Sequence, residues 1–188
     1  MSTKSDQAQG AYAACAAFIR DARDVGWQPP IANLSFVGSE NLTALLIKAG
    51  QTSGKDYTRD LINSQVVPSY EDTSLPAVRE YRDLMADGRS HLPDTPTRSD
   101  YVPLIHSFVG FEGFLNAKLL VEVVRRMGGT PTRRAVRDAA EGIRNLDLGI
   151  GTTLSFGPQQ HDGLTAVYYT TLRDGRFVPL TSWDHWKA

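Results

Sequence analysis

Apolar positions near the start of the chain follow first a helical period and then a strand-like run. Residues 11–25 contain neither proline nor glycine and predict a helix, which Gly26 ends. The apolar run 31–37 predicts a short strand buried on both faces, and residues 41–49 predict a second helix. The apolar face of the first helix is predicted to consist of Tyr12, Cys15, Ile19 and Ala22. Ligands of open α/β sheets collect beyond the carboxyl ends of the strands, so residues 35–40 are the first place to look for function.

The middle of the chain joins a second strand to a set of helices. Residues 61–67 predict a strand that Pro68 closes, and residues 68–76 are polar, lack periodicity and have a proline at each end. Such a segment suits a crossing between two bodies and is the best hinge candidate in the chain. Turn-rich residues 89–103 are expected on the surface, after a helix that Gly88 ends. Helices are predicted at 74–86 (Val78, Tyr81, Leu84 and Met85 on one side), 107–127 (Phe108, Phe111, Leu115, Leu119 and Val123) and 130–145 (Ala135, Val136, Ala139, Ala140 and Ile143).

The last third of the chain changes from helical to strand-like patterns. Residues 152–156, 166–172 and 177–180 are the strand candidates. Between the last two, an Asp174-Gly175 pair is a strong signal for a tight turn. The sequence therefore predicts a β-hairpin near the end of the chain.

Composition excludes several functional classes. The 188 residues carry a net charge of −1, with basic residues scattered, which argues against a nucleic-acid or anionic-membrane surface. A single cysteine excludes an internal disulfide and a thiolate zinc cage, and Cys15 is expected to be a packed thiol on an apolar helical face. The start of the chain lacks the apolar middle of a signal peptide, and no run approaches the roughly 20 apolar residues of a membrane span.

Motifs for catalysis, metals and nucleotides are weak or incomplete. The loop-like residues 50–56 have the wrong glycine spacing for a phosphate loop, and an Asp follows their Lys. Gly149 and Gly151 are too few for a dinucleotide fingerprint, and Ser39 lacks the second glycine of a nucleophile elbow. The histidines have no metal-binding spacing, and His161-Asp162 is more typical of a turn. No metal or cofactor is expected, and the pattern favours a binding protein over an enzyme.

Several ordered segments together resemble a known family. They are GAYAACAAFIRDAR, PIANLSFVGSE, SQVVPSYEDTSLPAVREY, FVGFEGFLNAKLLVEVVRRMGG, PTRRAVRDAAEGI and LDLGIGTTLSFGPQQHDGLTAVYYTTLRDGRFVPL. In this order they closely resemble the second half of type I periplasmic solute-binding proteins, and more narrowly the leucine/isoleucine/valine-binding group that serves ABC importers. The resemblance implies a Rossmann-like three-layer α/β/α fold, with parts of two lobes joined by a hinge and a C-terminal β-hairpin.

The resemblance also assigns a place in that fold to each segment. Residues 1–67 would end the second lobe, 68–76 would form the hinge crossing, 77–163 would complete the first lobe, and 164–188 would return as the hairpin and tail of the second lobe. Family members are about twice this length, so we expect the chain to be a truncated fragment. The family works in the periplasm, although the chain as given has no signal peptide.

Ligand contacts carried over by resemblance are Tyr12, Ser35 and Phe108, and Glu40 and Tyr70 are candidates for a further ligand or hinge contact. Ser35 falls where amino-acid binders often place an acid for the ligand's ammonium group. Because Ser is neutral, either Glu40 compensates or the ligand is not a simple α-amino acid. The structural alternative is that Tyr12 and Phe108 are core aromatics and that Ser35 is a hydrogen-bonded hydroxyl at a strand end.

The expected function is that of the solute-binding component of an ABC importer. Its ligand would be a branched-chain amino acid or a related small amino acid, amide or carboxylate, bound by lobe closure. The alternatives are a ligand-sensing domain of a signalling protein and a fragment that no longer binds ligand. Expected partners are the permease subunits and a second copy through the exposed truncated surface, but not nucleic acid.

Overall fold

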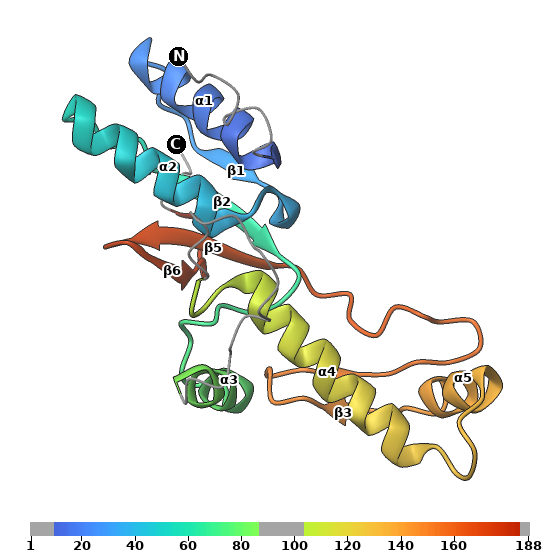
Figure 1. Cartoon of the computed structure of the whole chain (residues 1–188). Helices are drawn as coiled ribbons and strands as arrows, with labels where there is room; N and C mark the ends of the chain where they lie inside the picture. Colours follow the sequence, from blue (N-terminus) through green and yellow to red (C-terminus); the bar gives the residue numbers. More distant parts are fainter. Residues whose placement is uncertain (1–9, 87–103, 185–188) are drawn as a thin grey trace, which may run out of the picture. The chain divides into compact units, whose positions relative to one another are not determined.

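The structure is a computed structural model that describes residues 10–86 and 104–184 (Figure 1). The described residues divide into two compact units, one from residues 10–69 and 167–184 and one from residues 70–86 and 104–166. Predictions for residues 88–103, and for His91 and His185, lie outside the described ranges. Within those ranges no helix is both long and apolar enough to cross a membrane.

A four-stranded mixed sheet with helices packed on it forms the first unit. The strand order is β1-β2-β5-β6, in which β1 and β2 are parallel and the other neighbours are antiparallel. The elements of this unit are α1 (Gly10–Asp24), β1 (Ile31–Asn33), the 3-10 helix η1 (Ser35–Val37), α2 (Ser39–Ser53), β2 (Leu61–Gln65), β5 (Tyr168–Arg173) and β6 (Arg176–Pro179). The predicted α/β class is therefore confirmed.

The core of the first unit lies between the sheet and the helices α1 and α2. Ile31 and Leu61 are neighbours in the parallel register, and both pack in one cluster with apolar residues of the two helices. Ile19 of α1 and Leu42 of α2 are completely buried in this cluster. Tyr12 and Cys15 are half-buried against it, as the helical spacing predicted.

The hairpin predicted from Asp174-Gly175 is present. Strands β5 and β6 are antiparallel, and both turn residues have positive φ, 50° for Asp174 and 74° for Gly175. This left-handed pair matches the twist of the strands on either side. Ser69 is buried and donates a hydrogen bond to the Phe177 carbonyl oxygen at 2.7 Å, which attaches the end of the segment after β2 to this hairpin.

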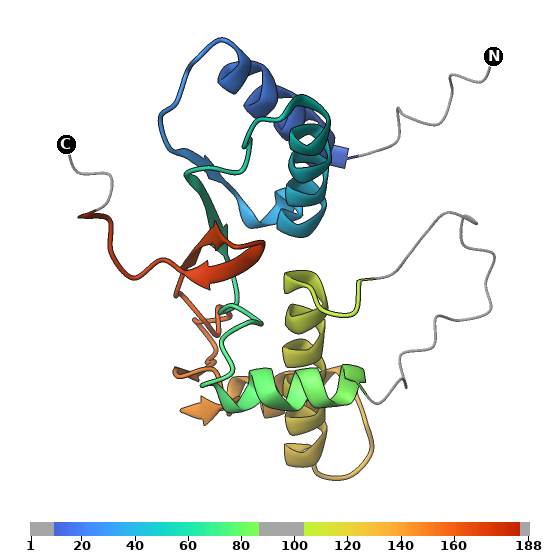
Figure 2. The ribbon, with the colours of Figure 1, turned by 90° about the vertical axis from the view of Figure 1, so that its left-hand side faces the viewer.

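The second unit is mostly helical and has an aromatic core. It contains α3 (Pro76–Ala86), α4 (Phe108–Arg126), α5 (Arg133–Glu141), β3 (Leu146–Asp147) and β4 (Thr153–Leu154), and α3 crosses α4 steeply in Figure 2. Tyr81 of α3 packs on Phe111 of α4, with ring centroids 5.3 Å apart. The Ser107 hydroxyl caps α4 by accepting a hydrogen bond from the Gly110 backbone N–H. Burial lowers the pKa of His106, with the Arg82 charge as a second cause.

Several predicted boundaries were wrong, each for a local reason. The strand predicted at 31–37 ends at Asn33, and residues 35–37 form a 3-10 helix that Gly38 closes at φ 79°. Helix α2 continues past Gly50 through most of the predicted loop 50–56 and ends at Gly54, which adopts φ 73°. Helix α5 is shorter than predicted because the Thr132 side chain caps its start and Gly142 ends it.

Burial also departs from the predicted helix faces. Leu84 of α3 is exposed although it was predicted on the buried side. In α5 no residue is buried, although Ile143, just beyond its end, is completely buried. The long helix α4 follows the prediction, with Phe108, Phe111, Leu115 and Val123 buried.

Candidate functional site

The parallel strands β1 and β2 end at the same edge of the first unit's sheet. Strand β1 ends at Asn33 and runs through Leu34 into η1 and α2, while β2 ends at Gln65 and continues to Val66. We call residues 34–40 together with Gln65 and Val66 the carboxyl edge. In open α/β sheets ligands bind outside this end of the strands.

A buried hydrogen bond attaches the carboxyl edge to the sheet. The Gln65 side-chain amide nitrogen donates to the Ser39 hydroxyl at 2.7 Å. Only 2% of Gln65 and 3% of Ser39 are exposed, so the bond is protected from water. Glu40, the next residue, is half-buried in the first turn of α2, where the helix dipole favours a negative charge.

Tyr12 and Ser35 both lie against this edge. A Cβ atom built at Gly38 would lie 3.7 Å from the Tyr12 ring, so α1 carries that ring beside the turn between η1 and α2. Ser35 is half-buried and opens η1, and its carbonyl oxygen accepts a hydrogen bond from the Gly38 N–H at 3.3 Å. Ser35 was predicted at the end of the strand, but it lies two residues beyond that end. The structure places Tyr12 and Ser35 beside Gly38, and Glu40 follows two residues later in the first turn of α2.

Exposed apolar side chains at the carboxyl edge were missed from the sequence. Phe36 is 74% exposed, and Leu34 and Val66 are also exposed. Phe36 and Leu34 lay inside the run that was taken for a buried strand, so their apolar character was assigned to the core. Recognising the glycine after residue 37 as the end of a short turn would have separated them from the strand.

Tyr70 and Phe108 lie together in the second unit. Their ring centroids are 4.9 Å apart in an edge-to-face arrangement, and both side chains are buried. The Arg82 guanidinium donates to the Tyr70 carbonyl oxygen at 3.2 Å and pairs with Glu71 at 3.4 Å. Arg82 of α3 thus holds the Tyr70 backbone, while the Tyr70 ring packs on Phe108.

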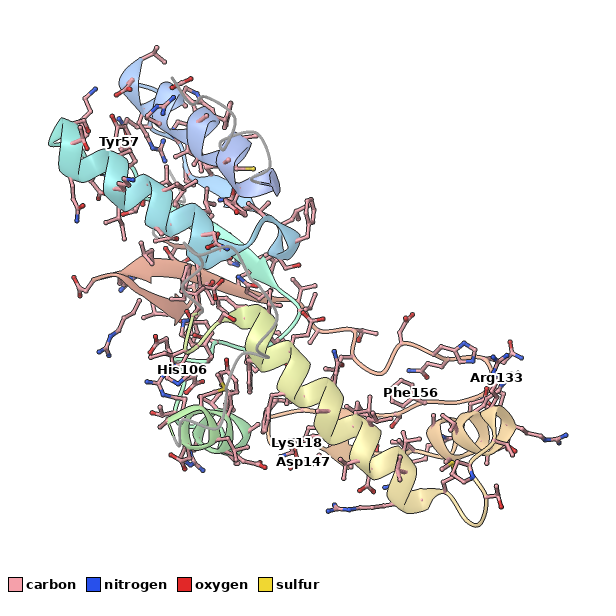
Figure 3. The ribbon with its side chains drawn as sticks, viewed as in Figure 1. Tyr57, His106, Lys118, Arg133, Asp147 and Phe156 are labelled. Atoms are coloured by element: carbon pink, nitrogen blue, oxygen red, sulfur yellow. The ribbon has the colours of Figure 1, made fainter. Side chains whose placement is uncertain are left out.

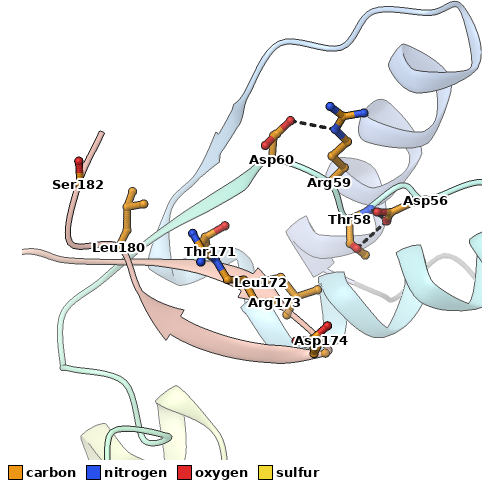
Figure 4. A pocket seen from close by; sticks show the side chains of 11 residues that line it. Asp56, Thr58, Arg59, Asp60, Thr171, Leu172, Arg173, Asp174, Leu180 and Ser182 are labelled. Atoms are coloured by element: carbon orange, nitrogen blue, oxygen red, sulfur yellow. Dashed lines mark hydrogen bonds and ion pairs between the residues drawn. The ribbon is translucent and has the colours of Figure 1, made fainter. Parts of the chain in front are cut away.

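A polar pocket of about 280 Å³ lies in the first unit, but at the other end of its sheet (Figure 4). Its walls come from the loop before β2 and from the turn between β5 and β6. In that loop Arg59 pairs with Asp60 at 3.3 Å, and the Asp56 carboxylate accepts hydrogen bonds from the backbone and side chain of Thr58. None of the predicted ligand contacts lines this pocket.

The second unit has a pocket of about 340 Å³ that is lined by residues of α5 and by Phe156; Figure 3 labels Phe156. Glu141 there pairs with Arg137 at 2.7 Å and with His161 at 3.5 Å, and the Arg137 hydrogen bond holds the pKa of Glu141 below its usual range. Glu141 thus lies within reach of both the Arg137 guanidinium and the His161 imidazole. Among the described residues, no cluster of three or more His, Cys, Asp or Glu side chains could hold a metal ion.

Comparison with known proteins places the fold. Neither the family models nor the curated proteins gave a match. Among solved structures, a possible leucine/isoleucine/valine-binding protein from Rhodopirellula baltica is 30% identical, with a TM-score of 0.75 over 94% of this chain and 42% of that chain. A substrate-binding periplasmic protein from Ralstonia solanacearum is 26% identical, with a TM-score of 0.66 over 88% of this chain and 42% of that chain. A branched chain amino acid ABC transporter from Thermus thermophilus with bound valine shares the fold at 20% identity, with a TM-score of 0.67 over 89% of this chain and 42% of that chain.

These neighbours show which fold the chain has. The chain has the fold of part of a type I periplasmic binding protein, and it spans about 42% of the length of the solved structures that it matches. One of these neighbours is named as a possible leucine/isoleucine/valine-binding protein and another as a branched chain amino acid ABC transporter, so the resemblance predicted from the sequence is confirmed. They are substrate-binding proteins.

Proposed function

We propose that the chain is part of the solute-binding component of an ABC importer. Its ligand would be a branched-chain amino acid or a related small amino acid, amide or carboxylate. The observation that carries the proposal is the carboxyl edge, where Ser35 and Glu40 lie on a turn that the Gln65–Ser39 hydrogen bond attaches to the sheet. In the complete fold, the lobes would close on the solute about the crossing at residues 68–76.

Glu40 is the proposed partner of the ligand's ammonium group. Ser35 cannot supply a negative charge. Glu40 can, and it lies in the first turn of α2, within the same carboxyl edge as Ser35. A charge-assisted hydrogen bond to a carboxylate is about twice as strong as one between neutral groups. The Ser35 and Tyr12 hydroxyls would then bond other polar atoms of the solute, while the Tyr12 ring excludes water.

The exposed apolar residues of the carboxyl edge support a solute that has an apolar side chain. Leu34, Phe36 and Val66 are exposed around the polar turn. Each would gain from the removal of water, at about 25 cal/mol per Å² of apolar surface buried. We therefore expect leucine and valine to bind better than glycine.

Phe108 and Tyr70 are proposed to act as a fixed aromatic pair in the second unit. Phe108 is 5% exposed, so a ligand contact would use the edge of its ring, while Tyr70 holds that ring in place. Substitution of Tyr70 by Leu would then weaken binding indirectly by loosening Phe108. If both Tyr70→Leu and Phe108→Leu left the affinity unchanged, the pair would have a purely structural role.

Isothermal calorimetry of the 188-residue chain with leucine, valine and glycine tests the proposal. We expect Glu40→Gln to weaken leucine binding by about 1.5–3 kcal/mol and Ser35→Ala by about 1 kcal/mol, because each loses a direct hydrogen bond. Ser53→Ala is the matched control, since Ser53 lies at the other end of α2 and its hydroxyl bonds the Ala49 carbonyl oxygen. No heat with any of these amino acids or with related amides and carboxylates, or an unchanged affinity in Glu40→Gln, would contradict the proposal.

ABC permease subunits are the proposed partners, and the periplasm is the proposed compartment. Both follow from the similarity to a substrate-binding periplasmic protein and to a branched chain amino acid ABC transporter. Genes for permease subunits are expected beside the gene for this chain. A kinase or cyclase domain in the same reading frame would instead support a ligand-sensing role.

We also propose that the chain self-associates weakly through α4. This helix has a second apolar side that is exposed, formed by Val109, Gly113, Ala117, Leu120 and Val124. An antiparallel copy would place its Leu120 over Gly113, where an added Cβ would meet nothing within 4 Å. The stripe is about 22 Å long and 10 Å wide, so it covers only about a quarter of the roughly 800 Å² that a stable interface buries on each partner.

Sedimentation velocity over a wide concentration range tests this association. We expect a monomer at low micromolar concentration, a dimer near millimolar concentration, and loss of the dimer in Leu120→Glu. Leu84→Glu is the control, because Leu84 is an exposed leucine on a different helix. A monomer at every concentration would contradict the proposal. The stripe would then be a surface that the part of the relatives' fold missing from this chain covers.

A further inference from the structure

The first turn of α2 lacks the usual side-chain cap. Its N-cap residue is Gly38, at φ 79°, which supplies no side-chain hydrogen bond to the first N–H groups of the helix. Ser39 instead uses its hydroxyl to accept the hydrogen bond from Gln65. The side-chain link between the start of α2 and the sheet therefore runs through these two residues.

Gln65 occupies a special place in the chain as well as in the sheet. It is the last residue of β2, a strand that lies between β1 and β5, and the next residues lead out of the first unit. Ser69, at the end of this exit, is bonded to the Phe177 carbonyl oxygen. The exit segment 66–69 is thus flanked by two buried side-chain hydrogen bonds, and the first of them leads directly to the residue before Glu40.

We propose that Gln65 is a positioning residue for the ligand site and acts through Ser39 on Glu40. This inference rests on the proposed function, since it requires that a solute binds at the carboxyl edge. When the amide is present, Ser39 is fixed and Glu40 is held at one position relative to Ser35. When the amide is absent, the hydroxyl of Ser39 has lost its partner in a site that excludes water, so the first turn of α2 shifts or frays.

The same bond gives ligand binding a path to the exit segment. A solute that fixes Glu40 would also fix Ser39, and through it the end of β2 where the chain leaves the first unit. The coupling requires no contact between Gln65 and the solute. It predicts that Gln65 and Ser39 act as one unit, so that losing either group has the effect of losing both.

Calorimetry with leucine and valine on five variants of the 188-residue chain tests the inference. Gln65→Met keeps the length of the side chain without its amide, Ser39→Ala removes the acceptor, and the third variant combines the two. Thr43→Val is the matched control, because Thr43 is a buried hydroxyl residue one turn further along α2. Melting temperatures of all variants separate a loss of folding from a loss of binding.

Each single variant is expected to weaken binding about tenfold, and the double variant no more than the stronger single one. Thr43→Val should stay within about twofold of the original chain, and Ser39→Thr, which keeps a hydroxyl, should restore most of the affinity. Unchanged affinity in both Gln65→Met and Ser39→Ala would overturn the inference and leave the proposed function standing. Equal weakening in Thr43→Val would also overturn it, since any buried polar group would then suffice, and no binding by the original chain would overturn both proposals.

Discussion

Arg23 connects three segments of the first unit, and its replacement by methionine is a direct test of how that unit is held together. The side chain is 5% exposed. Its guanidinium donates to the carbonyl oxygens of Trp27 and Pro29, each at 2.9 Å, and to that of Arg59 at 3.0 Å. Arg23 therefore fixes the end of α1, the link to β1 and the loop before β2. Methionine keeps much of the apolar stem but none of the donors.

The expected loss of stability is about 3 kcal/mol. Hydrogen bonds to a charged group contribute about 1.5–3 kcal/mol each, but two effects reduce the total. The freed carbonyl groups lie near the surface and regain water, and the Arg23 Nε atom has no hydrogen-bond partner among the described residues, so its removal relieves a cost. Three bonds reduced by about half give the stated figure.

Urea unfolding followed by tryptophan fluorescence measures this loss of stability in the first unit. Trp27 is in contact with Phe18 in the first unit, and residues 70–166 contain no tryptophan. Arg20→Met is the matched control, because Arg20 lies on the same helix and forms an exposed pair with Asp21, which should contribute little to stability. A change below about 1 kcal/mol for Arg23→Met, or one equal to that of the control, would refute the reasoning.

Two further predictions concern a glycine and an acid. Gly149→Ala should destabilise the second unit by about 1–3 kcal/mol, because Gly149 has φ 86° and an added Cβ would lie 2.9 Å from the Ala77 nitrogen. Circular dichroism in urea would measure this loss, and an unchanged unfolding midpoint would contradict the prediction. The pKa of Asp24 is lowered from 3.8 by hydrogen bonds from Lys55 and Tyr57. The carboxylate therefore stabilises the folded unit fully above pH 3.8, and this contribution is lost as the pH falls through the lower folded pKa. Urea midpoints of the original chain and of Asp24→Asn should differ at pH 7 and converge in acid, whereas a constant difference would contradict the assignment.

Elements with a strong local signal could be predicted from the sequence. Helix α4 was located to within a residue at each end because its apolar spacing is regular and Ser107 is a good cap. The hairpin was located because the Asp174-Gly175 pair favours positive φ at both positions. Helix α2 was placed too short, since a glycine at position 50 suggested an end that the packing of the helix overrides.

Long-range polar contacts could not be predicted in the same way. Gln65 and Ser39 are 26 residues apart, and Arg23 and Arg59 are 36 residues apart. Nothing in the local pattern distinguishes a glutamine that ends a strand by bonding a helix from one that faces water. Residues 35–40 were singled out by the strand-end rule for open α/β sheets, and the roles of Tyr12 and Ser35 came from the resemblance. The side chains that fix this edge became visible only when the register of the strands was known.

The helix-facing side of the sheet changes from apolar to polar toward the carboxyl edge. Ile31 and Leu61 are paired at one end, and two residues further on Asn33 and Asn63 are paired, with Thr170 opposite Asn63 on β5. These polar residues are buried, and among the described residues the Asn63 amide has no hydrogen-bond partner. A row of apolar residues would have made the folded unit more stable, since an unpaired buried amide destabilises it by about 1–3 kcal/mol. Residues that reduce stability are often found at functional sites. This row of polar residues leads to Gln65 and to the turn that carries Glu40. The polar gradient therefore supports the carboxyl edge as the functional end of the sheet on grounds of energy, independently of any resemblance.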